Sequence, residues 1–332
     1  MGKLLEVNNL EVSFNTYGGQ VSAVRGVSFH VNEGECIAIV GESGCGKSVT
    51  AKAIMRLIPS PPGYIKGGSI KFNNIDLLAI SRKKMQMIRG AEIGMIFQDP
   101  MTSLNPTMTI GKQIEENILI HQRISRRKAT ERTIEILKRV GIPNPEKRIN
   151  QYPHEFSGGM RQRVMIAMAI VCNPKLLIAD EPTTALDVTI QAQILDLMKD
   201  LQKSMKTAVI IITHNLGIVA NMAKRVMVFY AGKIIESASV EDIFYNPKHP
   251  YTWGLLKSVP KLHSQSKERL VSIEGTPPDL FSPPTGCAFA ARCEYAMKIC
   301  AKKYPPMMRV KENHEVTCWL LHERAPKIQR PS

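Results

Sequence analysis

Residues Gly41–Ser48 read GESGCGKS and match the pattern G-x-x-x-x-G-K-[S/T] at every position. The glycines permit backbone angles that turn successive amides inward around a phosphate, and a helix beginning here adds the partial positive charge of its N-terminus. Lys47 would reach the β- and γ-phosphates of a nucleotide, and the Ser48 hydroxyl would bind Mg²⁺. The residues expected to contact the nucleotide in this phosphate loop are Gly41, Ser43, Gly44, Cys45, Gly46, Lys47, Ser48 and Val49.

Two adjacent acids, Asp180 and Glu181, follow a short apolar run. A buried parallel strand would deliver Asp180 at its carboxyl end, where the ligands of open α/β sheets collect. Asp180 would then act on Mg²⁺, directly or through its hydration shell. Glu181 would point elsewhere and polarise an attacking water. Together with the phosphate loop, this pair predicts hydrolysis of a nucleoside triphosphate.

A second candidate anion site lies in the segment FSGGMRQR, which begins an apolar helix. Ser157, Gly158 and Gly159 offer a hydroxyl and backbone amides at a helix N-terminus. One chain is not expected to fold both sites onto one phosphate. Two chains arranged head to tail could do so, with each nucleotide between the phosphate loop of one chain and the Ser-Gly-Gly of the other.

The elements that must position these residues are strands in the first part of the chain, then helices, then strands again. Alternating residues predict strands over 4–14 and 21–31, and continuous apolar runs predict buried strands. The helical pattern covers 113–163 and includes a helix capped by Ser125. The predicted fold class is α/β, with a parallel core, an antiparallel β layer and a helical insertion. The buried strands are expected at residues 36–40, 176–179, 208–212 and 226–230.

The composition of the sequence changes after about residue 236, where prolines become frequent and the patterns typical of strands weaken. We therefore expect a nucleotide-binding domain over 1–236, with a helical subdomain at about 100–172, and a C-terminal appendage over 237–332. Because the motifs for phosphate chemistry end before residue 237, we expect nucleotide binding not to require the appendage.

The ordered motifs resemble the ATP-binding cassette (ABC) family over about residues 4–236. The resemblance implies an ATPase whose Gln98 senses Mg²⁺ and a membrane partner. It also implies that Asp187 crosses a dimer interface and that His214 touches the γ-phosphate. Phe14 would stack on adenine, with Tyr17 as a possible substitute.

The partners expected from this resemblance are two transmembrane permease subunits and a second ATPase subunit, either a related chain or the same one. An extracytoplasmic solute-binding protein would act indirectly. The longest apolar stretch, Val164–Cys172, is far below the roughly 18 residues of a membrane span. We therefore expect a peripheral protein on the cytoplasmic face of the cell membrane. The net charge of +15 is spread along the chain, which favours anionic lipid headgroups over nucleic acid, and no nucleic-acid partner is expected.

Four of the seven cysteines gather in the appendage, with 5, 6 and 17 residues between them: Cys287, Cys293, Cys300 and Cys318. Four thiolates can bind zinc or a four-iron cluster, and the spacing alone does not choose between them. Four free buried cysteines are the other possibility. Cys36 and Cys172 are expected in the core, and Cys45 at a variable position of the loop.

Three further stretches, QDPMTSLNP, NPKHPYTWGLL and GCAFAARC, resemble the branch of the ABC family that imports dipeptides and oligopeptides. This resemblance implies that the four cysteines hold a [4Fe-4S] cluster, with Zn²⁺ as the alternative. Two other functions stay open: an importer ATPase for nickel or another small solute, and a soluble ABC ATPase that acts on nucleic acid.

Overall fold

The computed structural model describes residues 2–183, 187–258 and 273–328. The chain forms two compact units, each assembled from segments that are distant in sequence. The first unit comprises Met1–Leu5, His30–Cys36 and Lys71–Ile212, and the second comprises Glu6–Phe29, Ile37–Ile70 and Thr213–Ser332.

The first unit contains three parallel strands in the order β8-β7-β6. Their residues are buried without exception, which is typical of parallel strands covered on both faces. The predicted strands at 176–179 and 208–212 are therefore confirmed. The strands are β6 (Ile93–Ile96), β7 (Leu176–Asp180) and β8 (Ala208–Ile212).

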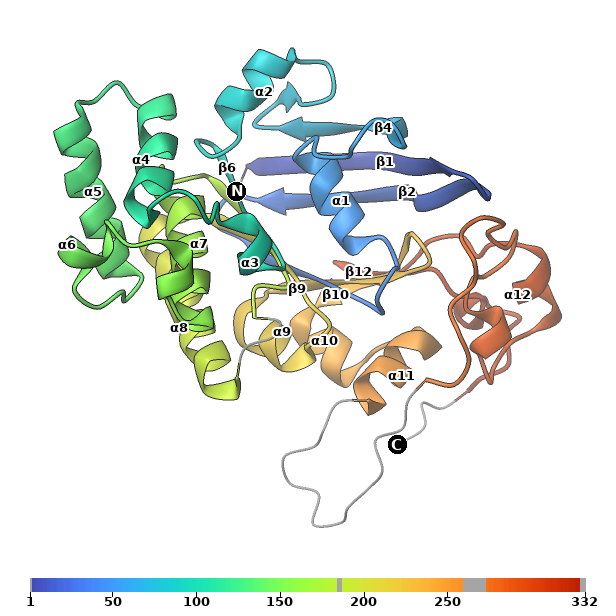
Figure 1. The fold of residues 1–332 in the computed structure, drawn as a ribbon. Helices are drawn as coiled ribbons and strands as arrows, with labels where there is room; N and C mark the ends of the chain where they lie inside the picture. Colours follow the sequence, from blue (N-terminus) through green and yellow to red (C-terminus); the bar gives the residue numbers. More distant parts are fainter. Residues whose placement is uncertain (1, 184–186, 259–272, 329–332) are drawn as a thin grey trace, which may run out of the picture. The chain divides into compact units, whose positions relative to one another are not determined.

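Helices make up most of the rest of the first unit (Figure 1). Ser125 caps one of them by accepting a hydrogen bond from the amide of Lys128, as the sequence predicts. Gly141, at φ 76°, follows the end of this helix. The helices are α2 (Arg82–Ile88), α3 (Pro100–Ser103), α4 (Ile110–His121), α5 (Arg126–Arg139), α6 (Pro145–Arg148), α7 (Gly158–Ile170) and α8 (Val188–Met205), with a 3₁₀ turn η1 (Pro153–Glu155) and a two-residue strand β5 (Ile75–Asp76).

The second unit has a mixed sheet in which strands pair in the order β3-β9-β10-β12-β11. β3 and β9 are parallel, and the later pairs are antiparallel. Through β10 and β12 the C-terminal strands therefore continue the sheet that begins at β3. The strands are β3 (Cys36–Val40), β9 (Arg225–Tyr230), β10 (Lys233–Ser239), β11 (Met308–Lys311) and β12 (His314–Val316).

A second set of strands in this unit follows the order β2-β1-β4. The alternation that predicts strands over 4–14 and 21–31 corresponds to the observed burial pattern. The strands are β1 (Lys3–Thr16), β2 (Gly19–Asn32) and β4 (Gly63–Phe72), and the last residues of β4 pair with β5 across a turn at Asn73 and Asn74.

The helices of the second unit are short, and α10 packs against β9 and β10. The strands β11 and β12 were not predicted, because three of the four residues of β11 are exposed and neither strand carries an apolar run. The helices are α1 (Lys47–Ile54), α9 (Leu216–Met222), α10 (Val240–Tyr245), α11 (Pro250–Lys257) and α12 (Lys298–Lys302), with 3₁₀ turns η2 (Ala290–Arg292) and η3 (Trp319–Leu321).

Among the described residues, no helix combines the length and the apolar character needed to cross a membrane.

Candidate functional site

The phosphate loop connects the buried strand β3 to the helix α1, as its sequence context predicts. Gly41, Gly44 and Gly46 have φ angles of 151°, 76° and 100°, which side chains disfavour. A Cβ at Gly41 would lie 2.3 Å from the carbonyl oxygen of Phe229, and one at Gly46 would lie 2.4 Å from that of Ala23. The loop therefore depends on glycine both for its angles and for its close packing.

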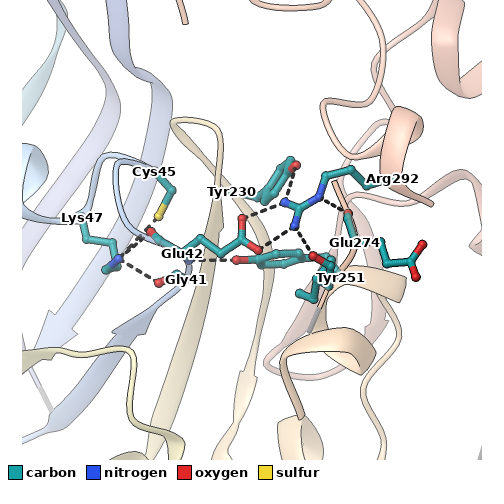
Figure 2. A network of polar contacts seen from close by, with 9 residues as sticks. Gly41, Glu42, Cys45, Lys47, Tyr230, Tyr251, Glu274 and Arg292 are labelled. Carbon is teal, nitrogen blue, oxygen red and sulfur yellow. Dashed lines mark hydrogen bonds and ion pairs between the residues drawn. The ribbon is translucent and has the colours of Figure 1, made fainter. Parts of the chain in front are cut away.

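Lys47 is the first residue of α1, and its side chain folds back over the loop. Its ammonium group donates hydrogen bonds to the carbonyl oxygens of Gly41 and Glu42, both at 2.8 Å (Figure 2). Although the residue is only 5% exposed, the charge is thus solvated by main-chain dipoles. Burial raises the pKa of the neighbouring Cys45 thiol, and Lys47 partly opposes this rise.

Two residues outside the motif, Tyr251 and Arg292, hold Glu42, and neither was predicted as a site residue. The Glu42 amide donates to the hydroxyl oxygen of Tyr251 at 2.9 Å. The carboxylate accepts two hydrogen bonds from the Arg292 guanidinium, at 2.7 and 2.9 Å. Arg292 also donates to the hydroxyl of Tyr230 at 3.2 Å. Tyr251 is the second residue of α11 and Arg292 ends η2, so both come from the part of the chain predicted as an appendage.

The acid pair lies at the end of β7 in the first unit. Asp180 is buried, with 4% exposure. Glu181 adopts φ 49°, a left-handed conformation that is unusual for a residue with a side chain, and its amide donates to the carbonyl of Ile212 at 2.8 Å. The Gln98 amide nitrogen donates to the Glu181 carboxylate at 2.9 Å. The structure therefore brings together two predicted site residues that are far apart in sequence.

The predicted second anion site begins α7. Ser157 is the N-cap, exposed, and accepts a hydrogen bond from the amide of Met160 at 3.4 Å. Gly158 and Gly159 form the first turn, and a Cβ at Gly159 would lie 2.9 Å from the Ile190 side chain of α8. Asp187 caps α8 by accepting from the amide of Ile190 at 2.9 Å.

The remaining predicted residues lie in the second unit. His214 is exposed and stands directly before Asn215, which caps α9. Phe14 is half-buried, with its ring 2.7 Å from where a Cβ of Gly63 would lie. Tyr17 is fully exposed. Phe14 therefore packs beside Gly63, whereas the Tyr17 side chain lies in solvent.

The four C-terminal cysteines all belong to the second unit, as free thiols. The Cys287 amide donates to the carbonyl of Cys300 at 2.7 Å. Burial raises the pKa of Cys318 to about 12, and the other three cysteines contribute to the rise because they lie near enough to oppose a thiolate there. Within the described residues, however, no group of three or more His, Cys, Asp or Glu is arranged to hold a metal ion. The expected [4Fe-4S] or Zn²⁺ site is therefore not confirmed.

Two family models match the chain: "ABC transporter" over residues 24–184 and "Oligopeptide/dipeptide transporter, C-terminal region" over residues 235–300. The chain belongs to the ABC transporter family, and it carries the C-terminal region of the oligopeptide and dipeptide group. It is an ABC ATPase.

Two relatives from Bacillus subtilis (strain 168) match over almost the whole chain. The oligopeptide transport ATP-binding protein OppD is 64% identical over 99% of this chain and 92% of its own length. The dipeptide transport ATP-binding protein DppD is 57% identical over 98% of this chain and 97% of its own. Among solved structures, the ATP-binding cassette MJ0796, a dimer in a post-hydrolysis state with ADP and Pi, is 26% identical with a TM-score of 0.64. That match covers 71% of this chain and 98% of the cassette.

Proposed function

We propose that this chain hydrolyses ATP in the presence of Mg²⁺ and thereby energises the uptake of dipeptides or oligopeptides through a membrane importer. The observation that carries the proposal is the 64% identity to an oligopeptide transport ATP-binding protein over 99% of the chain. Similarity of that extent includes the phosphate loop, the acid pair and the C-terminal region together.

The division of the chain that we propose is a nucleotide-binding domain over residues 1–236, with a helical subdomain at about 100–172, and a C-terminal domain over 237–332. The positions of the two family matches, 24–184 and 235–300, support it. The helical subdomain would contact the membrane partner. The C-terminal domain distinguishes this group from ATPases that consist of the cassette alone.

The phosphate loop has the properties that a bound triphosphate requires. Its glycines hold the turn, Ser43 and Gly44 are exposed, and Lys47 supplies a positive charge that can move from the loop carbonyls to a phosphate. We propose that residues 41 and 43–49 bind the phosphates and that Phe14 stacks on the base. The hydroxyl and carboxylate oxygens of Ser48 and Asp180, with the amide oxygen of Gln98, are hard ligands of the kind Mg²⁺ prefers. When bound, the ion would neutralise charge on the β- and γ-phosphates.

For hydrolysis we propose Glu181 as the group that orients and deprotonates water. The hydrogen bond from Gln98 to Glu181 supports this assignment, because it fixes the carboxylate. Lys47 would stabilise charge on the γ-phosphate, and His214, which is exposed after the strand β8, would hold the arrangement.

We further propose that a second ATPase subunit, a related chain or a copy of this one, completes each site. In that arrangement Ser157, Gly158 and Gly159 would contact the ATP bound by the second subunit, and Asp187 would lie at the interface. The exposure of Ser157 and Asp187 supports this, and the related cassette MJ0796 is a dimer. Closure and opening of this dimer would drive two transmembrane permease subunits, with a solute-binding protein outside. The chain would then be peripheral, at the cytoplasmic face of the membrane.

The four C-terminal cysteines are proposed as the ligands of a [4Fe-4S] cluster, or alternatively of Zn²⁺. Their mutual effect on thiol pKa and the link between Cys287 and Cys300 support a common site. The proposal requires the side chains to rearrange on loading, since the described residues hold no preformed ligand group. Iron, sulfide and zinc analysis of anaerobically purified protein, beside a variant with all four cysteines changed to serine, tests it.

The function is tested with proteoliposomes that contain the two permeases, the ATPase pair and the solute-binding protein. We expect ATP turnover to rise when a dipeptide or an oligopeptide is supplied and not when nickel is supplied. Stimulation by nickel alone would replace the peptide assignment and leave the transport ATPase in place.

A further inference from the structure

Glu42 is the second residue of the phosphate loop, and each of its polar groups has a partner (Figure 2). Its amide donates to Tyr251, its carbonyl accepts from Lys47 and its carboxylate accepts two hydrogen bonds from Arg292. Two of these three partners, Tyr251 and Arg292, come from beyond residue 236. The C-terminal part of the chain therefore holds one peptide of the loop by its amide and by its side chain.

The side chain of Arg292 is held in one position by hydrogen bonds and by packing. Its guanidinium donates to the carbonyl oxygens of Glu274 and Ile273, at 2.9 and 3.0 Å, as well as to Tyr230 and Glu42. Its side chain is 5% exposed, and the rings of Tyr230 and Phe289 lie 5.8 Å from its central carbon. The hydrogen bonds to Glu42 are the largest cause of a raised pKa at Arg292, so the charge is permanent.

Tyr251 is equally fixed. It is fully buried, and its ring packs on Tyr230 at 4.6 Å and edge-on to Phe289 at 5.4 Å. Because this packing fixes the ring, the Tyr251 hydroxyl keeps its position in the core. The amide of Glu42 is therefore anchored to the core of the second unit.

The contacts of Tyr251 and Arg292 with Glu42 are important because the third contact, from Lys47, is lost when a nucleotide binds. Lys47 donates to the carbonyls of Gly41 and Glu42, and it must turn to the phosphates when a nucleotide binds. Once Lys47 has left, only Tyr251 and Arg292 still hold the polar groups of Glu42. The loop is also held at its far end, where the Gly232 amide donates to the carbonyl of Cys45 at 3.0 Å, so Tyr251 and Arg292 would fix its beginning.

We propose that Arg292 is a positioning residue for ATP binding: through its bidentate contact with Glu42, and together with Tyr251, it holds the phosphate loop in its binding conformation after Lys47 has moved. The proposal rests on the proposed role of the loop in binding ATP. It also reverses the sequence-based expectation that residues beyond 236 are not needed for nucleotide binding.

A simpler role must be separated from this one. Arg292 could act only by neutralising the Glu42 carboxylate, which would otherwise repel phosphate. In that case a lysine at position 292 would serve as well as arginine, and removing both charges would restore binding. A positioning role requires the planar fork of arginine, because lysine offers a point charge and cannot make two parallel hydrogen bonds in a fixed direction.

The test measures ATP affinity, KM for ATP, kcat and thermal unfolding for Arg292→Lys, Arg292→Met, Glu42→Gln and the double variant Glu42→Gln/Arg292→Met, in the full-length protein. We expect Arg292→Lys to weaken ATP binding about 10-fold, within the usual range of coupling between neighbouring groups. KM should rise more than kcat falls, since the reacting groups are untouched. The double variant should stay as weak as Arg292→Met.

Two results would overturn the proposal. One is native ATP affinity in a folded Arg292→Lys variant. The other is recovery of native affinity in the double variant, which would leave only charge neutralisation. Should Arg292→Met fail to fold, Arg292→Lys, which retains the charge, still decides the question.

Two controls keep the outcomes distinct. Arg309→Met breaks an exposed pair with Glu315 in the same unit, with side chains 73% and 37% exposed, and should leave ATP binding unchanged. Lys47→Met should weaken ATP binding about 100-fold. If Lys47→Met binds ATP normally, the proposed role of the loop fails. If its binding is weakened but the Arg292 variants bind normally, only the positioning role fails.

Discussion

The phosphate loop and the acidic end of β7 are both turns that follow a buried strand, but they are built differently. In the loop, three glycines supply φ angles of 151°, 76° and 100°, so the conformation belongs to the main chain. At the end of β7, Glu181 adopts φ 49° although it has a side chain, at a cost of roughly 1–2 kcal/mol. The phosphate loop therefore presents main-chain groups, whereas the turn after β7 orients the carboxylate of Glu181.

This difference predicts that the two turns control different steps. A loop made from main-chain groups is suited to binding phosphates before the reaction, whereas an oriented carboxylate is suited to moving a proton during it. Changes in the loop should act on affinity, and changes at Glu181 should act on turnover. The predictions below separate the two.

The largest effect is expected from Glu181→Gln, which removes the base but can still accept the hydrogen bond from Gln98. ATP turnover should fall about 1,000-fold, within the usual range for a general base, with ATP affinity unchanged. Phosphate release and equilibrium ATP binding measure the two quantities. Glu131→Gln, at an exposed position on α5 with 64% exposure, is the matched control. Turnover within about 10-fold of the native rate would exclude Glu181 as the base.

Lys47→Met should show the opposite pattern. It removes the positive charge that the loop carbonyls hold, and ATP affinity should fall about 100-fold. The control Lys52→Met lies on the same helix, is exposed and should bind ATP normally. Equal losses in both variants would mean that general charge on α1, rather than Lys47, attracts the nucleotide.

Two glycines of the loop permit a finer comparison. Gly46→Ala combines φ 100° with a Cβ only 2.4 Å from a main-chain oxygen, whereas a Cβ at Gly44 would meet nothing within 4 Å. Gly46→Ala should lower the free energy of unfolding by about 3 kcal/mol and Gly44→Ala by about 1 kcal/mol. Denaturant unfolding measures both. Similar values for the two variants would mean that the loop relaxes around the new methyl group.

The loop could be predicted because its chemistry lies in eight consecutive residues with a strand before and a helix after. Buried strands such as β7 and β8 could be predicted for the same reason, since an apolar run is a local signal. The contact between Gln98 and Glu181 spans 83 positions, and only the family resemblance pointed to Gln98.

The contact of Arg292 with the phosphate loop could not be predicted, although the residue lies in the stretch GCAFAARC that resembles the peptide-importing branch. It lies 250 positions from Glu42, in a segment whose cysteines predict a metal site and not a contact with the phosphate loop. An arginine in a sequence is most often a solvated surface residue, and only the fold shows it buried against the loop. The four cysteines show the opposite case. The sequence predicts a metal centre there, but the described residues show no formed ligand group.

The smallest effect tests whether the support of the loop depends on pH. His249 caps α11, where its ring nitrogen Nδ1 accepts from the amide of Tyr251 at 3.0 Å, and burial lowers its pKa to about 4. The folded protein therefore keeps this histidine neutral, while the unfolded chain binds a proton below about pH 6.5. Stability from this residue is present above pH 6.5 and is lost progressively between pH 6.5 and 4.

Between pH 7.5 and 5.5 the free energy of unfolding should fall by about 1 kcal/mol on account of His249. His249→Asn retains an acceptor at the cap and does not titrate, so the variant should lose less stability over this interval. Because the folded protein keeps His249 neutral over this interval, its hydrogen bond from the Tyr251 amide is retained, and ATP affinity should not change on account of this residue. An identical pH profile of the unfolding free energy in the variant would assign the loss of stability to other groups.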